Sequence, residues 1–306
     1  MRALAGAAAL LMSAACSGGN AGTSASVPSR ESPPHAFEAM SGVRVAAAGD
    51  IACAPGEKVS ATTCRAADTA RLVRQFRPRY VLALGDIQYD DGRLADMRTA
   101  YATTWGRFTS RTRPVPGNHD YHQDRAAGYL AYFQQQTGGR SYYAFDVGRW
   151  RFYALDSNCS DMDCDTEAAW LEEDMAANPR ACTAIAMHHP RYSSGAEHGD
   201  STSVRALWAV ALDHHVDLAL AGHDHDYERF VAMDADGHVT PSGLVSFVVG
   251  TGGKSLYDEG RRHEGSVVFY NDRAGVLDLK LGADSYGWRF RSVDGTRVDS
   301  GVRRCR

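Results

Sequence analysis

Seven residues of this sequence have side chains that commonly bind transition metals, and all of them lie just past the ends of short apolar runs. They are Asp50, Asp86, Tyr89, Asn118, His188, His223 and His225. A mixture of carboxylate, amide and phenol oxygens with imidazole nitrogens suits iron, manganese or zinc, whereas calcium prefers oxygen ligands alone. Seven ligands are too many for one ion. The set therefore predicts two metal ions that share one carboxylate.

Glycine stands directly before several of these residues. The glycines are Gly49, Gly85, Gly117 and Gly222. Because glycine allows a tight turn at a strand end, each turn can direct the next side chain toward a common point. His223 and His225 are two positions apart, so both side chains point the same way in an extended segment. One short segment can therefore reach both ions.

The apolar runs that precede these residues read as buried strands. They are residues 43–48, 80–84, 114–116, 183–187 and 216–221. Helical patterns lie between them, at residues 61–76, 94–108, 126–136, 166–178 and 203–214. Alternation of strands and helices predicts a layered α/β fold. In such folds, binding sites form at the carboxyl ends of the strands, where all of these ligands would meet.

The second half of the sequence adds strands to this pattern. A hairpin is predicted over residues 142–155 with its turn at Gly148, and further strands are predicted at 245–249, 267–270, 276–281 and 288–293. The predicted architecture is a two-sheet β-sandwich flanked by helices, classed as α/β or, in some schemes, α+β. A binuclear metal site is predicted at the carboxyl ends of its strands.

The order of the motifs resembles the calcineurin-like metallophosphoesterase superfamily. The motifs are GD at 49–50, GDxxY at 85–89, GNHD at 117–120, HxP at 188–190 and GHxH at 222–225. Many members carry histidine two residues after the first aspartate, but this chain has Ala52 there. Tyr89 stands where the purple acid phosphatase branch has a tyrosine ligand, so the pattern is most similar to that branch. The alternative for Tyr89 is an aromatic side chain packed beside the site.

The resemblance implies a ligand set for each ion, with Asp86 bridging. The first ion would be bound by Asp50, Asp86, Tyr89 and His225, and the second by Asp86, Asn118, His188 and His223. Because a phenolate is a hard anionic donor, Fe(III) is expected beside Tyr89, with divalent iron, zinc or manganese at the other position. His189 is an alternative to His188 as a ligand of the second ion. The family places this ligand two residues before a proline, and Pro190 stands at that distance from His188.

The resemblance also implies two histidines that act on the substrate. His119 resembles the family's histidine that faces the phosphate, as a stabiliser of the transition state or as an acid. His198 lies ten residues after His188 and resembles a substrate-side histidine of the plant enzymes. The alternative for His198 is a solvated loop residue. The expected reaction is hydrolysis of phosphate monoesters by a metal-activated hydroxide.

Other functions stay open at this point. A phosphodiesterase of the same superfamily would use the same ions on a different small phosphorylated substrate. A surface lipoprotein that binds metal or phosphate without catalysis belongs to a different class.

The sequence has 33 Lys and Arg against 37 Asp and Glu, which excludes a strongly basic nucleic-acid binder. Glu228 and Arg229 are predicted to form an ion pair behind the site. The sequence does not indicate the oligomeric state.

The first residues resemble an export signal. Residues 1–16 have a basic start, a short apolar stretch and small residues before Cys16, as in a lipoprotein signal that leaves this cysteine lipidated. The alternative is an ordinary secretory signal cleaved near Ala15. Residues 17–41 are rich in Ser, Gly, Ala and Pro and are predicted to be a flexible tether, with the enzyme domain at 42–306. Membrane attachment would then run through the lipid anchor at Cys16.

Six cysteines remain after Cys16, and an even number in an exported protein suggests disulfides. The sequence does not fix which of them pair. Local pairing is the simplest arrangement, and it joins Cys53 to Cys64, Cys159 to Cys164 and Cys182 to Cys305.

Overall fold

The computed structural model describes Met1 and residues 35–306. The predicted signal segment, the lipidation site at Cys16 and the tether as far as residue 34 lie outside the described residues. Within the part that is described, no helix has the length and apolar character that crossing a membrane requires.

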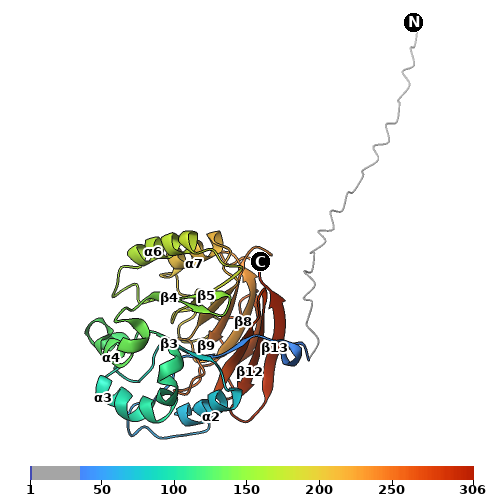
Figure 1. Cartoon of the computed structure of the whole chain (residues 1–306). Coiled ribbons are helices and arrows are strands. Elements are labelled where there is room, and N and C mark those ends of the chain that lie inside the picture. The colour runs from blue at the N-terminus through green and yellow to red at the C-terminus, as the bar shows by residue number, and fades with distance from the viewer. Residues whose placement is uncertain (2–34) are drawn as a thin grey trace. The chain divides into compact units, whose positions relative to one another are not determined.

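Two mixed β-sheets form the centre of the domain (Figure 1). The six-stranded sheet has the order β13-β12-β11-β1-β2-β3. Its strands are β1 Val43–Ala48, β2 Tyr80–Leu84, β3 Thr112–Val115, β11 Gly275–Leu281, β12 Ser285–Ser292 and β13 Arg297–Arg304. The seven-stranded sheet has the order β10-β8-β9-β7-β6-β5-β4. Its strands are β4 Tyr143–Val147, β5 Trp150–Ala154, β6 Cys182–Ala186, β7 Leu218–Ala221, β8 Tyr227–Met233, β9 Leu244–Val249 and β10 Ser266–Tyr270.

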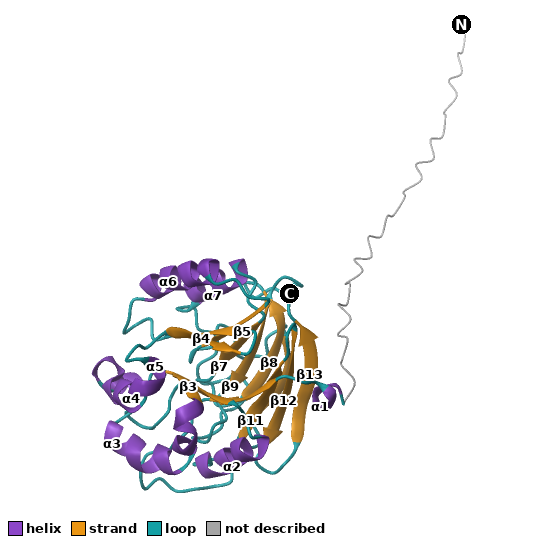
Figure 2. Cartoon of the chain, in the orientation of Figure 1, coloured by secondary structure: helices purple, strands orange, loops and turns teal. Residues whose placement is uncertain are grey.

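Helices flank both sheets (Figure 2). They are α1 Ala36–Ala39, α2 Ala66–Phe76, α3 Leu94–Asp96, α4 Ala127–Tyr132, α5 Gln134–Thr137, α6 Cys164–Ala177 and α7 Arg205–Asp213. The α2 helix packs against β1 and β11 of the six-stranded sheet, and α6 and α7 pack against each other. The predicted helix at 94–108 is divided into α3, a π-helical turn Met97–Tyr101 and a 3₁₀ helix Trp105–Arg111.

Parallel strands in each sheet bring the predicted ligands to one edge. The strands β1, β2 and β3 are parallel neighbours in one sheet, and β5, β6, β7 and β9 are parallel neighbours in the other. Most of their residues are buried because both faces of each sheet are covered, which explains the continuous apolar runs in the sequence. Parallel strands end on the same side, so the polar residues that follow them converge.

The strand predictions at 43–48 and 80–84 are confirmed with the same bounds. Each of the three predicted disulfides is also formed. The predicted tether is too long, because Ala36–Ala39 form α1, where the side chain of Phe37 is buried. Lys280 holds this helix by donating hydrogen bonds to the carbonyl oxygens of Phe37, Glu38 and Met40. The folded part therefore begins near residue 36.

The predicted ion pair between Glu228 and Arg229 is wrong. These adjacent residues belong to β8, and neighbouring side chains of a strand point to opposite faces. Arg229 instead pairs with Asp299, with Nε 2.7 Å from Oδ2. Glu228 accepts a hydrogen bond from the backbone N–H of Ser194 at 2.8 Å. Glu228 thus holds a loop beside the site rather than a neighbour on its own strand.

Candidate metal centre

The predicted ligands lie directly after the carboxyl ends of β1, β2, β3, β6 and β7. Asp50, Asp86 and His223 have positive φ angles of 59°, 47° and 74°. Residues other than glycine adopt this left-handed conformation at an energetic cost, and such strain is concentrated at functional sites. Gly117 has a different role, since a Cβ atom there would lie 2.2 Å from Oδ1 of Asp86. The glycine leaves room for this carboxylate.

Three metal-binding atoms surround the hydroxyl oxygen of Tyr89. This oxygen lies 2.9 Å from Oδ1 of Asp50, 2.9 Å from Oδ2 of Asp86 and 3.0 Å from Nε2 of His225. All of these side chains are buried. The other ring nitrogen of His225 is hydrogen-bonded to Ser255 Oγ at 2.9 Å, which fixes the ring. We call these residues the tyrosine cluster: Asp50, Asp86, Tyr89 and His225.

A second group of donor atoms surrounds Nε2 of His188. This nitrogen lies 3.0 Å from Oδ1 of Asn118, 3.2 Å from Nδ1 of His223 and 3.5 Å from Oδ1 of Asp86. The Nδ1–H of His188 donates to the carbonyl oxygen of Leu84 at 2.8 Å, so Nε2 keeps a free lone pair. We call this group the histidine cluster: Asp86, Asn118, His188 and His223.

Asp86 belongs to both clusters, because Oδ2 faces Tyr89 and Oδ1 faces His188. The backbone N–H of His119 also donates to Oδ1 at 2.9 Å. Asp50 differs, because its Oδ1 contacts the Tyr89 hydroxyl while its Oδ2 accepts only the backbone N–H of His223 at 3.0 Å. The carboxylate of Asp86 is therefore placed as a bridge between two ions would be.

The donor set fits metal ions on electrostatic grounds. Burial raises the pKa of Asp50 to about 7, and burial with the adjacent carboxylates raises the pKa of Tyr89 well above its usual range. Burial also lowers the pKa of His225 to about 4 and that of His223 further, so both imidazoles are neutral. A cation would stabilise the anionic oxygens and use the free imidazole lone pairs.

His119 and His198 lie on either side of the clusters. The Nδ1–H of His119 donates to the carbonyl oxygen of Asp90 at 2.6 Å, and its Nε2 lies 3.9 Å from Oδ2 of Asp86. The ring of His198 stacks on the ring of His223, with centroids 4.0 Å apart and planes 21° apart. The structure therefore brings both predicted substrate histidines to the site.

Comparison with known proteins agrees with this geometry. The family profile of calcineurin-like phosphoesterases matches residues 43–227, which is most of the described domain. The chain belongs to the calcineurin-like phosphoesterase family.

Within this family the chain is similar to purple acid phosphatases. It is 27% identical over 267 residues to purple acid phosphatase 23 of Arabidopsis thaliana, covering 74% of this chain and 54% of that protein. It is 26% identical over 232 residues to purple acid phosphatase 22 of the same plant, covering 70% and 51%. The chain therefore spans about half the length of these curated relatives.

A solved structure shares the fold. The purple acid phosphatase PPD1 from yellow lupin (Lupinus luteus) seeds superposes with a TM-score of 0.69 at 19% identity, covering 86% of this chain and 53% of that one. This likeness confirms the predicted α/β sandwich of two mixed sheets with flanking helices. Membership of this family implies two metal ions, and the site holds groups of metal-binding atoms that include Asp50, Asp86, His188 and His223.

Three residues of the site were not predicted from the sequence. The ring of Tyr257 stacks on that of His225, with centroids 3.9 Å apart. The ammonium of Lys254 lies 5.0 Å from the ring centre of Tyr89 and pairs with Glu57 at 2.6 Å. Asp224, between two predicted ligands, accepts hydrogen bonds from the backbone N–H groups of the loop that carries His198. Asp224 is the variable residue of the GHxH motif, whereas Tyr257 and Lys254 come from loops outside the predicted motifs.

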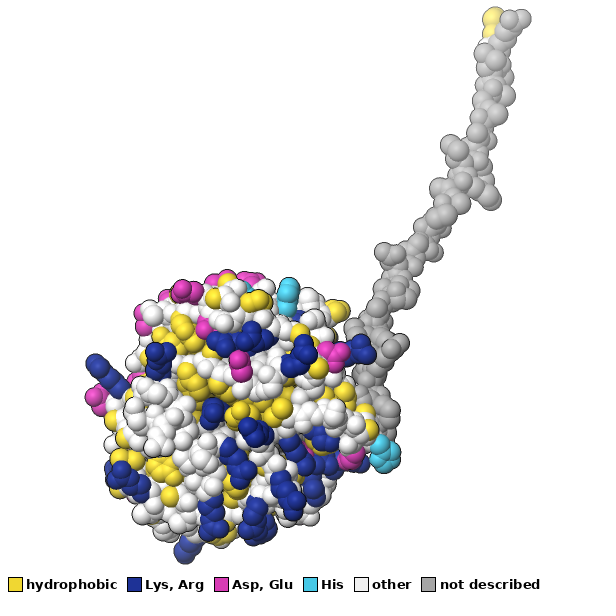
Figure 3. Space-filling model, viewed as in Figure 1, with side chains coloured by type: hydrophobic (Ala, Val, Ile, Leu, Met, Phe, Trp, Pro, Cys, Tyr) yellow, Lys and Arg dark blue, Asp and Glu magenta, His cyan; other side chains and the backbone are white. Residues whose placement is uncertain are grey.

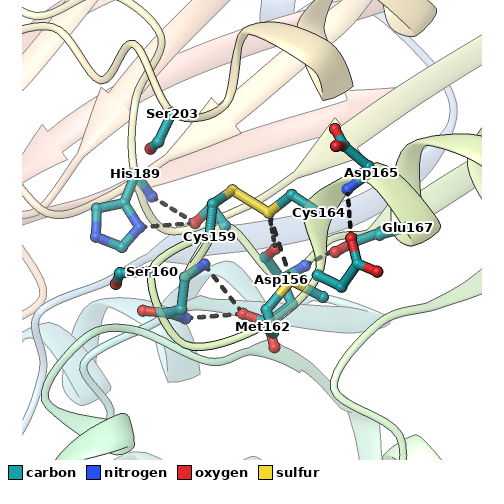
Figure 4. The surroundings of a disulfide bond; sticks show 12 residues. Asp156, Cys159, Ser160, Met162, Cys164, Asp165, Glu167, His189 and Ser203 are labelled. Atoms are coloured by element: carbon teal, nitrogen blue, oxygen red, sulfur yellow. Dashed lines mark hydrogen bonds between the residues drawn. A yellow bond between two sulfur atoms is a disulfide. The ribbon is translucent and has the colours of Figure 1, made fainter.

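His189, the alternative to His188, lies beside a disulfide-closed loop (Figure 4). Ser157, which precedes this loop, lies 2.9 Å from Nδ1 of His189 and accepts hydrogen bonds from the backbone N–H groups of both histidines. His189 does contribute to a group of nearby metal-binding atoms with His188 and His223. Its hydrogen bond to Ser157 leaves Nε2 free, as the bond from Nδ1 to Leu84 does in His188, so the choice of His188 stays a prediction.

The helix α6, which follows this loop, contains a buried acid whose ionisation opposes folding. Glu167 accepts a hydrogen bond from the backbone N–H of Asp156 through Oε1, while Oε2 has no partner among the described residues (Figure 4). Burial raises the pKa of Glu167 from 4.5 to about 9. The folded state therefore holds this proton more tightly than the unfolded state does, and this contribution to stability is lost as pH rises from 4.5 toward 9.

We expect Glu167→Gln to stabilise the protein above neutral pH. Glutamine keeps the accepting oxygen and cannot ionise, so the gain should grow by about 1.4 kcal/mol for each pH unit above the unfolded pKa and reach a few kcal/mol. Urea unfolding at mildly acidic and mildly alkaline pH would measure it. Glu173→Gln, an exposed site on the same helix, is the control. A gain that is the same at both pH values would contradict the assignment.

Proposed function

We propose that this protein is an exported phosphatase that hydrolyses phosphate monoesters at a binuclear metal centre. One observation carries the proposal: two clusters of metal-binding atoms meet at the single carboxylate of Asp86. Family membership supports phosphoester chemistry, and the similarity to purple acid phosphatases favours monoesters. A phosphodiesterase of the same family is the alternative, since it would use the same two clusters.

Each cluster would hold one ion. Asp50, Tyr89 and His225 would bind the first, Asn118, His188 and His223 the second, and Asp86 both. When bound, two such ions supply an activated water and neutralise negative charge on the phosphoryl oxygens. We propose Fe(III) in the tyrosine cluster and divalent iron, zinc or manganese in the histidine cluster, because phenolate favours the harder ion.

His119 and His198 would then act on the substrate itself. The bond from His119 to the carbonyl of Asp90 fixes its ring and leaves Nε2 directed toward the clusters. From there it can donate a hydrogen bond to the phosphoryl group or a proton to the leaving alkoxide. The ring of His198 is held parallel to that of His223, so it would contact the phosphate from the side of the histidine cluster.

We expect Tyr89→Phe to remove the visible absorption of the iron-loaded protein. The absorption would arise from charge transfer from phenolate to Fe(III), and phenylalanine has no oxygen to donate. Iron affinity should fall by about 10- to 100-fold or more, as for loss of other groups that support a metal. The matched control is Tyr257→Phe, because that ring stacks on His225 without its hydroxyl joining the cluster. An unchanged spectrum in Tyr89→Phe would place the tyrosine outside the ligand set.

The function is tested by initial rates of the purified full chain on an aryl phosphate monoester and the matching diester. Higher kcat/KM on the monoester supports the phosphatase. Preference for the diester would establish the phosphodiesterase with the same metal centre. A metal-loaded protein without activity on either would indicate a non-catalytic, metal- or phosphate-binding surface protein.

Export is proposed on separate grounds. Three disulfides in the described domain suit an oxidising compartment, as exported proteins meet outside the cytoplasm. We propose that the chain is either anchored to a membrane through a lipid on Cys16 or secreted. Mass spectrometry of the mature N-terminus separates these two outcomes, because only the first leaves a diacylated cysteine.

A further inference from the structure

Arginines are concentrated on one side of the domain, although the whole chain has more acidic than basic residues. Residues 65–79 and 107–113 together contain eight arginines and a single acidic residue, Asp68. In Figure 3, basic side chains cover the lower part of the visible face, where Figure 1 places α2 and β12, while acidic side chains gather along the top, over α6. The charge is therefore separated within the molecule.

The two segments that carry these arginines adjoin each other in the structure. We call these arginines the arginine surface: Arg71, Arg74, Arg77, Arg79, Arg107, Arg111 and Arg113. The guanidinium of Arg111 donates to the carbonyl oxygen of Pro78 at 3.1 Å, which joins the two segments. Among the described residues, Arg74, Arg79 and Arg107 are exposed and have no carboxylate within ion-pair distance. Their charge is available to an external anion.

This surface lies at the edge of the sheet opposite the metal centre. Arg79 directly precedes β2, and Arg111 directly precedes β3. The predicted metal ligands Asp86 and Asn118 follow the other ends of the same two strands. A flat surface that meets the arginines therefore leaves the metal centre facing away from it.

The chain enters the domain beside the arginine surface. The guanidinium of Arg289 lies 4.6 Å from the ring centre of Phe37 in α1 and 6.0 Å from that of Phe76, at the end of α2. Glu38 of α1 pairs with Arg289 at 3.2 Å and with Arg297 at 3.4 Å. These contacts fix α1 next to the end of α2 that carries Arg74 and Arg77. The described domain therefore begins on the side that carries the arginine surface.

We propose that the arginine surface binds the anionic headgroups of a phospholipid bilayer and orients the metal centre toward the solvent. Phosphate groups in a lipid plane match a broad array of guanidinium groups, and each basic residue near such a plane raises binding roughly fivefold. The inference rests on the proposed export but not on the phosphatase activity. Hydrolysis of a small substrate in solution does not require this surface.

The test uses the full chain with Cys16→Ser, which removes the lipid and leaves only the surface to bind. Cosedimentation is measured with vesicles of phosphatidylcholine alone and of phosphatidylcholine with phosphatidylglycerol, at low and high salt. The test variant carries Arg74→Glu and Arg107→Glu. Its control carries Arg261→Glu and Arg273→Glu, which change the net charge equally at exposed positions outside the arginine surface.

Binding should require phosphatidylglycerol, weaken with salt, and fall on the order of 100-fold in the test variant but little in the control. Equal loss in the two variants, or no binding to anionic vesicles, would overturn the proposal. Tighter binding to a single-stranded oligonucleotide than to the vesicles would also overturn it. Melting temperatures and hydrolysis of an aryl phosphate by the test variant should match those of the parent, which separates failure of this inference from failure of the proposed function.

Discussion

Replacement of Asp86 by asparagine is expected to abolish hydrolysis and to release metal from both clusters. The two oxygens of this carboxylate face different clusters, so one substitution weakens both sites. An amide keeps the size of the side chain but has no negative charge and only one accepting oxygen. We expect kcat to fall by at least about 10³-fold, more than for loss of a single stabilising donor.

Rates on an aryl phosphate and elemental analysis of the purified protein would measure this effect. Asp217→Asn is a matched control, because Asp217 is also buried and holds backbone N–H groups, but it lies at the opposite end of β7 from His223. If Asp86→Asn kept two ions and full activity, the bridge between the clusters would be wrong.

His119→Asn is expected to lower kcat by about 10²- to 10⁴-fold while both ions stay bound. Only the backbone N–H of His119 contacts Asp86 at hydrogen-bond distance, so the substitution leaves the donor atoms in place. If His119 protonates the leaving group, alkyl phosphates should lose more activity than aryl phosphates with acidic leaving groups. If it only stabilises the phosphoryl group, the losses should be equal.

His122→Asn is the control for this experiment. The Nδ1 of His122 binds the same carbonyl oxygen of Asp90 at 3.0 Å, and its ring centre lies 4.7 Å from that of His119. The control should therefore retain most of the activity. Loss of metal from His119→Asn would instead make His119 part of the metal centre and would contradict the proposed role.

The sequence predicted the strands that precede the ligands well because these strands are buried on both faces. Residues 43–48 and 80–84 are short apolar runs, and nothing in them competes with a strand. The convergence of Asp50 and Asp86 follows from the parallel order of β1 and β2, and His188 joins them from the other sheet. Their roles as ligands remain predictions, because proximity alone does not establish metal binding.

The strands β8 and β13 were not predicted, since their sequences carry charged residues that look solvated. The structure explains these charges by contacts between distant segments. Asp299 of β13 accepts hydrogen bonds from Tyr227, Arg229 and Trp288. Such a buried polar network satisfies its own donors and acceptors, and no local sequence pattern records it.

The predicted helix at 94–108 is helical in the structure, but it is not one regular α-helix. The amide oxygen of Gln88 accepts a hydrogen bond from the backbone N–H of Tyr101, and Trp105 donates to Thr69 of α2. These bonds hold the segment in a π-helical turn followed by a 3₁₀ helix. The sequence pattern predicted a helix here, but tertiary contacts decided which types of helical turn form.

The metal centre draws its ligands from both sheets. Asp50, Asp86 and Asn118 follow strands of the six-stranded sheet, and His188 and His223 follow strands of the seven-stranded sheet. Bound ions would therefore clasp the two halves of the sandwich together at one edge, and their binding energy would add to the stability of the fold. Scarcity of metal would then shorten the lifetime of the folded protein as well as abolish its activity. A chelator should lower the melting temperature and speed proteolysis, even in variants that have already lost catalytic activity.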